Sequence, residues 1–385
     1  MSANGREGMR IKAKILILGA GFGGLELATL LSESLGDAVD VTLIDKSDHF
    51  MFGFSKLDIM FGNAKANALR MPYRNFAKPG VRFRRETIKS IDPAARRVST
   101  NRATYDADHL VVALGAEYDF EATPGLSEAH EFYSVAGAER VRDALPRFKR
   151  GHALIGVCGA PFKCPPAPSE CALMLHDYLE RRGVRRACEI SFVLPLSAPV
   201  PPSPETSKAL IAAFEERGIA FHAGKGIASV DARRGIATLD DGGQMPFDLF
   251  LGVPKHRVPR AVLDSGLAEN GWVPVNPRTL ETRYPGVYAV GDGANTGTPK
   301  AGVFAEGAAK AVASALIAKL KGGQASQYDG FGTCYIEFGG GRIGKVEVDF
   351  FSGPHPTGTY HEPSIALRAD KDGFGASRRA RWFGM

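Results

Sequence analysis

The order of apolar and polar residues along the chain predicts an α/β fold. Short, continuous apolar runs are typical of strands buried on both faces of a parallel sheet. Such runs lie at residues 14–18, 39–44, 153–157 and 189–194, and another lies within 105–116. Helical patterns lie at residues 25–31 and 170–180, and an alanine-rich helix is expected at 301–321. This alternation favours parallel sheets covered by helices.

A glycine-rich turn joins the first strand to the first helix. It reads Gly19-Ala-Gly21-Phe-Gly-Gly24, and the second strand ends in Asp45, 21 residues beyond Gly24. In a dinucleotide site the first glycine permits the turn and the second lets the backbone approach a pyrophosphate. The third allows close packing of helix on strand, and the acid accepts a ribose hydroxyl. Because strand, turn, helix, strand and acid occur in this order, we predict such a site here.

Two later segments indicate which dinucleotide is bound. Residues 105–116 form a polar turn and a buried strand that stops at Gly115, and residues 285–293 repeat this pattern with Asp292 at the strand end. With these segments the chain resembles the two-dinucleotide-binding-domain flavoproteins. The resemblance implies FAD as the cofactor, with Asp292 at its ribityl and pyrophosphate region.

The helix expected at 301–321 adds positive charge near the flavin. Its N-terminal end, near Gly302, would stabilise the anionic edge of reduced flavin. Lys300 would add a further positive charge there, unless it is a solvated lysine at the helix start. The residues expected to contact FAD are Gly19, Gly21, Phe22, Gly24, Asp45, Lys46, Ala113, Gly115, Gly291, Asp292, Lys300, Ala301 and Gly302.

A second α/β unit should begin near residue 150, but it lacks the features of an NAD site. Its turn reads Gly156-Val-Cys158-Gly159-Ala-Pro161, further prolines follow, and its next strand ends in Pro195 without a carboxylate. Pro161 removes a backbone donor where a phosphate would need one. We therefore expect no ordinary NAD binding, with a nicotinamide cofactor held by other contacts as the alternative.

Two cysteine segments identify a narrower resemblance. Phe162-Lys-Cys164-Pro-Pro-Ala-Pro-Ser-Glu170 follows this turn, and Gly332-Thr-Cys334-Tyr-Ile-Glu337 lies far along the chain. They resemble the redox-cysteine segments of the sulfide:quinone oxidoreductases and of the flavoprotein subunit of flavocytochrome c sulfide dehydrogenase. The similarity continues through residues 254–257, 291–292 and 299–302, so it covers most of the chain.

The resemblance implies a redox disulfide between Cys164 and Cys334 over one flavin face. Hydrosulfide or another thiolate would attack one sulfur, leaving a persulfide on one cysteine and a thiolate on the other, and two electrons would pass to FAD. Glu170 matches a general acid/base of that family. Lys300 is counted with Cys164, Cys334 and Glu170 as a catalytic residue. Lys163 could lower the pKa of the neighbouring Cys164 thiol by its charge.

Other cysteines and one histidine leave alternatives open. Cys158 could replace either redox cysteine or relay sulfur for it. Cys171 and Cys188 fit thiols buried in a core. His256 could face the flavin, although a structural histidine is the simpler interpretation.

Composition limits the partners and the location. The five cysteines form no pair pattern of a zinc site, so no metal is expected, and a formal net charge of +6 requires no nucleic acid. No apolar run reaches the length of a membrane span and no signal peptide is recognisable, which favours a cytoplasmic protein. The basic, aromatic residues 366–385 could bind the inner face of an anionic membrane, or form a packed terminus. A homodimer is left open.

These features predict a domain organisation and a function. We expect an FAD-binding domain in two parts, residues 1–120 and 256–325, and a second Rossmann-like domain of degenerate NAD type over 121–255. A short C-terminal region, 326–385, carries the second redox cysteine. The predicted activity is FAD-dependent oxidation of sulfide, or a related thiol or persulfide, with a quinone as acceptor. The alternatives are a type II NADH:quinone oxidoreductase and a flavin-bearing redox-sensing protein.

Overall fold

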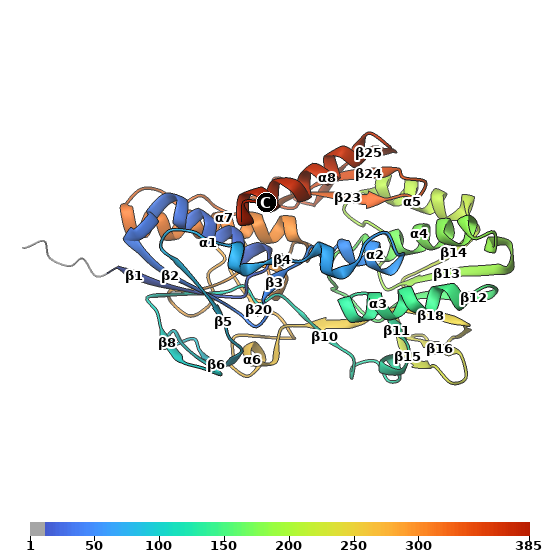
Figure 1. The fold of residues 1–385 in the computed structure, drawn as a ribbon, viewed down its shortest axis with the longest axis horizontal. Coiled ribbons are helices and arrows are strands. Elements are labelled where there is room, and N and C mark those ends of the chain that lie inside the picture. Colours follow the sequence, from blue (N-terminus) through green and yellow to red (C-terminus); the bar gives the residue numbers. More distant parts are fainter. Residues whose placement is uncertain (1–11) are drawn as a thin grey trace, which may run out of the picture.

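Two parallel sheets form the body of the molecule. The computed structural model describes residues 12–385, and Figure 1 shows one sheet in each half of the long axis. Ile17 and Leu18 are neighbours in the central strand of the first sheet and both are fully buried, so both faces of that sheet are covered. In spatial order this parallel sheet consists of β21 (Val287–Ala289), β9 (His109–Val112), β1 (Ala13–Leu18), β2 (Val39–Asp45) and β5 (Val81–Arg85).

Two long helices pack together on the first sheet. α1 (Phe22–Leu35) follows the glycine turn, and α7 (Gly302–Lys321) comes from far along the chain and packs against it. A Cβ atom on Gly24 would lie 1.9 Å from the carbonyl oxygen of Gly19, which is why this position needs glycine. A small antiparallel sheet, β6 (Ile88–Asp92), β7 (Arg97–Thr100) and β8 (Thr104–Asp106), extends this half.

The second sheet has the same architecture. Its order is β11 (His130–Glu131), β18 (Leu249–Val253), β12 (Gly151–Val157), β13 (Cys188–Leu194) and β14 (Ile219–Ala223), all parallel. Three helices cover it, α3 (Val135–Ala144), α4 (Ala167–Arg181) and α5 (Pro204–Glu216), and an antiparallel meander follows, β15 (Ile227–Asp231), β16 (Ile236–Leu239) and β17 (Gln244–Pro246). The predicted α/β class with two Rossmann-like sheets is confirmed.

Three segments connect the two halves. β10 (Glu117–Asp119) and β19 (Lys255–Arg257) pair antiparallel where the chain crosses from one half to the other and back. An ion pair of 2.8 Å between Arg257 and Asp119 reinforces this pairing. The short helix α2 (Ser55–Met60) belongs in sequence to the first half but packs against α3 of the second. Side chains of α2 therefore lie at the junction.

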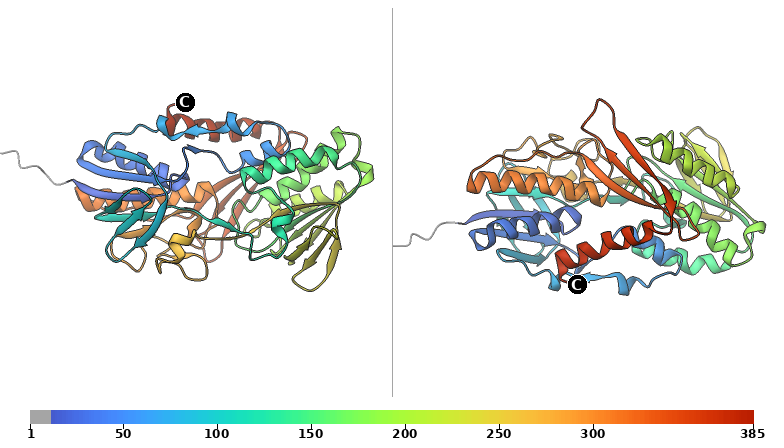
Figure 2. Two further views of the ribbon diagram at one scale, coloured as in Figure 1. Left: turned by 60° about the horizontal axis from the view of Figure 1, so that its bottom comes forward. Right: turned by 90° about the horizontal axis from the view of Figure 1, so that it is seen from above.

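The C-terminal region covers this junction. It contains an antiparallel sheet of β23 (Phe331–Glu337), β24 (Ile343–Asp349) and β25 (Thr357–Ser364), followed by α8 (Leu367–Arg378) and a π-helical turn, Arg379–Phe383. We call residues 367–383 the C-terminal strap. Seen from above, the strap lies along the same face as α1 and α7 (Figure 2).

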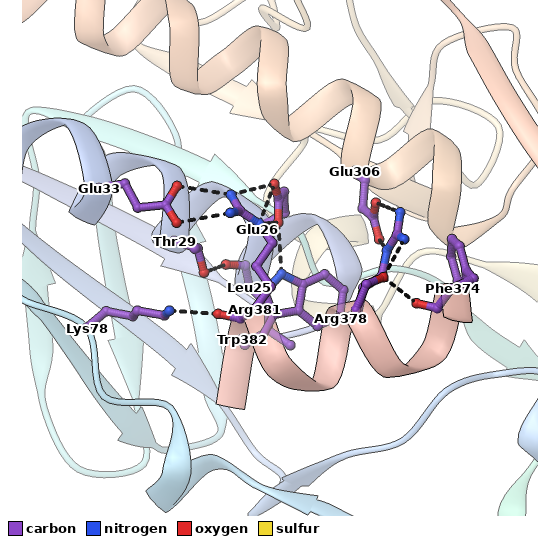
Figure 3. Close-up of polar contacts among 11 residues, drawn as sticks. Leu25, Glu26, Thr29, Glu33, Lys78, Glu306, Phe374, Arg378, Arg381 and Trp382 are labelled. Atoms are coloured by element: carbon purple, nitrogen blue, oxygen red, sulfur yellow. Dashed lines mark hydrogen bonds and ion pairs between the residues drawn. The ribbon is translucent and has the colours of Figure 1, made fainter. Parts of the chain in front are cut away.

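Ion pairs attach the C-terminal strap to these two helices (Figure 3). Arg381 pairs with Glu26 at 2.9 Å and Glu33 at 3.0 Å, both on α1, and Arg378 pairs with Glu306 of α7 at 2.8 Å. Trp382 is 1% exposed and donates its indole N–H to Glu26 at 2.8 Å. These side chains make contacts inside the molecule, as in the packed-terminus alternative. Over residues 12–385, no helix combines the length and apolar character of a membrane span.

Candidate functional site

A cavity of about 470 Å³ lies where the two halves and the C-terminal region meet. This volume is typical of cofactor sites and far exceeds what a sulfide ion needs. Its lining includes most of the predicted cofactor residues, namely Gly19, Gly21, Phe22, Asp45, Ala113, Gly115, Gly291, Asp292, Lys300, Ala301 and Gly302, and also Cys164, Glu170 and Cys334. Segments far apart in the sequence are thus brought to one site.

The glycine turn leaves room for a ligand at one position only. Gly19 has a φ of +100°, and a Cβ there would lie 2.3 Å from the carbonyl oxygen of Ala113. Gly21, by contrast, has no atom within 4 Å of its Cβ position. The helices that begin at Phe22 and Gly302 have no side chain capping their first N–H groups, and both ends line the cavity. Free N–H groups beside an open glycine fit the pyrophosphate of FAD.

Asp45 is held in place at the end of β2. Its carboxylate oxygens accept the N–H groups of Ala20 and Ser47, each at 2.8 Å, and the side chain borders the cavity. An oxygen that accepts one N–H keeps a lone pair for a ribose hydroxyl. The next residue, Lys46, does not line the cavity: its side chain is 71% exposed and pairs with Glu117 at 3.4 Å. The expected contact of Lys46 with the cofactor is therefore not supported, because successive residues along an extended chain point to opposite sides.

The segment before α7 packs closely on the other turns. Cβ atoms would lie 2.8 Å from the Gly115 oxygen at Gly293 and 2.7 Å from the Phe22 ring at Gly302. Burial raises the pKa of Asp292, and nearby lysines lower it in part. Small residues and a buried carboxyl at this point fit the ribityl end of the cofactor.

Lys300 is not a solvated lysine at a helix start. It is 6% exposed, and its ammonium donates to the carbonyl oxygens of Asp292 at 2.7 Å and Ala294 at 3.3 Å. It also lies 3.6 Å from the ring centroid of Trp272. Burial lowers the pKa of Lys300 to about 8, and Asp292 opposes this shift. The charge is thus fixed against the turn beside the cavity.

The two predicted redox cysteines line the same cavity from different elements. Cys164 lies in the loop before α4 and Cys334 in β23, and both are thiols in this structure. Cys164 has an unusual φ of +50°, and its N–H donates to the Lys300 oxygen at 2.8 Å. Burial raises the pKa of Cys164, and the neighbouring Glu170 and Cys334 raise it further. Burial, with a contribution from Glu170, raises the pKa of Cys334 to about 12.

Glu170 lies in the first turn of α4, near both thiols. It is 2% exposed, and its carboxylate accepts the N–H of Glu337 at 2.9 Å. Burial raises its pKa to about 7, against the lowering effects of Lys371 and this N–H. A buried carboxyl with a pKa near neutrality can both take and give a proton.

Lys163 does not act on the thiol beside it in the sequence. Its ammonium donates to the Ala116 oxygen at 2.9 Å and lies 4.2 Å from the Tyr118 ring centroid, so its charge is turned toward the β10 strand. The lysine whose charge lowers the pKa of Cys164 is Lys56 on α2. The sequence pattern does not reveal Lys56, because a lysine in a short apolar helix gives no sign of which cavity it reaches.

The remaining cysteines lie apart from the cavity lining. Cys158 is buried in a cluster with Leu126 and Leu154, so it does not meet Cys164, and burial raises its pKa to about 12. Cys171 and Cys188 are core thiols, as expected.

His256 is a structural residue. Its Nδ1 lies 2.8 Å from the Pro254 oxygen, its ring packs edge-on against Tyr118 and Tyr133, and burial lowers its pKa to about 3. The imidazole is therefore neutral at physiological pH, and it does not contribute to the cavity lining.

In the second half, the turn after β12 corresponds to the glycine turn after β1. Side chains of the protein fill the space beside its glycines. A Cβ on Gly159 would lie 3.1 Å from the Lys255 side chain, and a Cβ on Gly156 would lie 2.6 Å from Ile227. Neither glycine has the open space that is found at Gly21. The loss of ordinary NAD binding stays a prediction, which the crowding at these two glycines favours.

The C-terminal strap supplies cavity residues that the sequence did not reveal. Lys371 and Phe374 line the cavity, and Lys371 pairs with Glu337 at 2.6 Å. Phe374 lies 6.3 Å from Tyr335 and 6.4 Å from Phe54, measured between ring centroids. The spacing of three between Lys371 and Phe374 places both on one helix face, but only the fold shows that this face borders the cavity.

Comparisons with known proteins define the class. The pyridine nucleotide-disulphide oxidoreductase family model matches residues 13–315, and the chain belongs to this family. The protein is therefore an oxidoreductase and a flavoprotein that binds FAD. Within the family, it resembles the mitochondrial sulfide:quinone oxidoreductase of Mus musculus, with 27% identity over 365 residues, 89% of this chain and 80% of the relative.

Two further comparisons agree with this similarity. The sulfide-quinone reductase of Aquifex aeolicus is 26% identical over 335 residues, 80% of this chain and 76% of the relative. The X-ray structure of the sulfide:quinone oxidoreductase from this organism superimposes with a TM-score of 0.84 at 22% identity, covering 96% of this chain and 91% of that one. A type II NADH:quinone oxidoreductase of Staphylococcus haemolyticus is 34% identical, but only over 30% of either chain. The resemblance expected from the cysteine segments is confirmed.

Proposed function

We propose that the protein oxidises sulfide, or a related small thiol or persulfide, and passes the electrons through FAD to a quinone. The observation that carries this proposal is that Cys164, Cys334 and Glu170 line one cavity with the dinucleotide turn. Relatives named as sulfide:quinone oxidoreductases, similar over most of the chain, support the substrate and the acceptor.

A disulfide between Cys164 and Cys334 is the proposed oxidant within the chain. The sulfur of the substrate forms a bond to one cysteine sulfur, and the bond between the two cysteines breaks. The substrate sulfur then belongs to a persulfide on one cysteine, and the electron pair of the broken bond stays on the other as a thiolate. Glu170 accepts the proton of the attacking sulfhydryl, because its pKa of about 7 leaves part of it ionised at neutral pH.

The cavity residues divide into a cofactor side and an acceptor side. When bound, FAD supplies a two-electron acceptor that hands electrons onward. The Gly19–Gly24 turn and the two uncapped helix ends hold its pyrophosphate, and Asp45 holds a ribose. The aromatic wall of Phe54, Tyr335 and Phe374 suits a planar quinone ring. Because quinones dissolve in the bilayer, a protein with this activity would work at a membrane surface.

Anaerobic titration of the flavin tests this function. We expect sulfide to bleach the flavin absorbance within seconds, NADH to leave it unchanged, and a short-chain quinone analogue to restore it. Rapid bleaching by NADH would contradict the proposal and favour a type II NADH:quinone oxidoreductase. Tightly bound FAD whose absorbance is bleached by neither sulfide nor NADH would favour a redox-sensing protein.

Cysteine variants test the disulfide separately. Cys164→Ser and Cys334→Ser should each slow bleaching by sulfide at least a hundredfold, because each removes one of the two sulfurs. Cys158→Ser is the matched control, since Cys158 is buried in another cluster, and it should bleach at the rate of the unmodified protein. Normal bleaching in either of the first two variants would rule the disulfide out.

A further inference from the structure

The two helices whose uncapped ends line the cavity carry a glutamate at the same position. α1 begins at Phe22 and has Glu26 as its fifth residue, and α7 begins at Gly302 and has Glu306 as its fifth residue. Four residues advance an α-helix by about 6 Å along its axis. Each glutamate therefore lies about one turn behind the free N–H groups that face the cavity.

Both glutamates are buried close to these helix ends. Glu26 is 4% exposed and Glu306 is 5% exposed. α1 and α7 pack against each other, and a Cβ atom on Gly302 would lie 2.7 Å from the Phe22 ring, so the two helix ends are adjacent. A negative charge near a helix N-terminus cancels part of the positive potential that attracts an anion. Because a pyrophosphate is itself negatively charged, two free carboxylates at these places would oppose its binding.

Two arginines of the C-terminal strap bind these carboxylates (Figure 3). Arg378 donates to the two carboxylate oxygens of Glu306, at 3.0 Å from Nε and 2.8 Å from its terminal nitrogen. Arg381 binds the two oxygens of Glu26 in the same way, at 2.9 and 3.0 Å. A guanidinium that binds both oxygens of a carboxylate is held in a fixed orientation. Both buried charges are therefore neutralised by well-ordered ion pairs.

The neutralising charges come from the strap and not from the two helices. In the described part of the chain, the cation within ion-pair distance of Glu306 is Arg378, and for Glu26 it is Arg381. α1 contains no lysine or arginine. Lys310 of α7 lies one turn beyond Glu306, but its side chain is exposed to solvent. The charge behind the cofactor turn thus depends on residues at the other end of the sequence.

We propose that Arg378 and Arg381 are positioning residues for FAD, which act through Glu306 and Glu26. By neutralising these two carboxylates, the arginines leave the positive potential of both helix ends available to the pyrophosphate. The inference rests on the placement of the pyrophosphate at these helix ends, and it does not depend on sulfide as the substrate. It gives the basic residues of the C-terminal strap a role in holding the cofactor.

The FAD affinity of charge variants tests this role. The holoenzyme is diluted in steps at pH 8, well above the ordinary pKa of a carboxyl, and free FAD is measured by its fluorescence after ultrafiltration. Arg378→Met leaves the Glu306 carboxylate unpaired and should raise the dissociation constant about tenfold. Glu306→Gln removes the negative charge instead and should bind FAD at least as tightly as the unmodified protein. The double variant Arg378→Met/Glu306→Gln has neither charge and should return to within about threefold of the unmodified protein.

These three variants distinguish neutralisation of charge from support of the cavity wall. Arg378 also packs on the Phe374 ring, with its guanidinium carbon 3.9 Å from the ring centroid. If Arg378 acted only by supporting this wall or the fold, the double variant would bind FAD as weakly as Arg378→Met, and Glu306→Gln would also bind it more weakly. Either result would overturn the inference.

Arg368→Met is the matched control. Arg368 is another strap arginine that pairs with a buried glutamate, Glu337, at 3.0 Å, but Glu337 lies on β23 and keeps Lys371 as a partner. Its loss should change the FAD dissociation constant less than twofold, and equal weakening here would contradict the inference. Circular dichroism checks folding; if Arg378→Met does not fold, Arg378→Gln takes its place. Unchanged affinity in the folded neutral variant would also overturn the inference, whereas the sulfide titration decides the proposed function separately.

Discussion

At the scale of single residues, Glu170 keeps its proton at pH values where an exposed carboxyl has lost it. Its side chain is 2% exposed, and of the charged groups around it Lys371 favours ionisation, whereas Glu337 and Asp58 oppose a further negative charge. Ionising this buried group lowers the free energy of unfolding. That cost is the reason why Glu170 can hold a proton in the cavity of the two thiols near neutral pH.

We expect Glu170→Gln to change how stability depends on pH. The pKa of Glu170 is about 7 in the folded protein and 4.5 as its ordinary value. Unfolding therefore releases a proton between these values, and the stabilisation present below pH 4.5 is lost as pH rises through 7. Relative to Glu170→Gln, which keeps the oxygen that accepts the Glu337 N–H, the unmodified protein should lose up to about 3 kcal/mol between pH 4.5 and 8. Urea unfolding across this range measures the difference, and parallel pH curves would contradict it.

Alanine substitutions at Gly21 and Gly24, two positions of the glycine turn, should separate an effect on FAD binding from an effect on folding. Gly21→Ala places a methyl group in open space, and its φ of −79° suits alanine. The variant should fold with an unchanged melting temperature when FAD is removed, yet bind FAD at least tenfold more weakly. Gly24→Ala places its Cβ 1.9 Å from the Gly19 oxygen and should lower the stability of the apoprotein itself. Fluorescence titration with FAD and thermal melting distinguish the two, and normal FAD affinity in Gly21→Ala would contradict our placement of the pyrophosphate.

At the scale of elements, the C-terminal strap joins helices from opposite ends of the sequence. Its arginines reach carboxylates on α1 and α7, and the indole of Trp382 packs edge-on against Phe22 and Phe50, 5.5 and 5.6 Å between ring centroids. Phe22 is the first residue of α1 and lines the cavity. The strap therefore supports Phe22 from behind, while its Lys371 and Phe374 line the same cavity.

Arg381→Met should destabilise the protein by about 2–3 kcal/mol, because it leaves the Glu26 carboxylate, 5% exposed, with only the Trp382 indole as partner. Arg260→Met is the control. Arg260 forms a comparable ion pair with Asp264, but both side chains are more than half exposed, so the change should stay within about 0.5 kcal/mol. Urea midpoints of the two variants measure the difference. Equal effects would mean that burial of Glu26 does not matter.

At the scale of the whole molecule, the sequence predicted those features of the fold and the site that short segments determine. The glycine turn, the apolar strands and the cysteine loop each lie within a few neighbouring residues, and Asp45 follows the turn at a characteristic spacing, so pattern and spacing were sufficient to find them. The directions of Lys46 and Lys163, and the position of Lys56 and the C-terminal strap, depend on which distant elements pack together. No local pattern contains that information, and these are the features that required the structure.

The proposed disulfide would join two distant parts of the molecule. Cys164 precedes α4 of the second half, whereas Cys334 lies in β23 of the C-terminal region. Closing so long a loop restricts the unfolded chain, typically by about 4–5 kcal/mol in the entropic description. The oxidised protein should therefore melt several degrees above the reduced protein, and Cys334→Ser should abolish this difference. A melting temperature that does not respond to reduction in the unmodified protein would count against the bond.

The position of the C-terminal strap also sets the order in which the site can be completed during synthesis. The glycine turn emerges from the ribosome first, but the Trp382 ring that packs on Phe22 emerges after the whole of both sheets. Domains fold as the chain appears, at about 5–20 residues per second. The nascent protein thus carries an unfinished cofactor pocket until residue 382 has emerged, and FAD can be held in its final form only after that point.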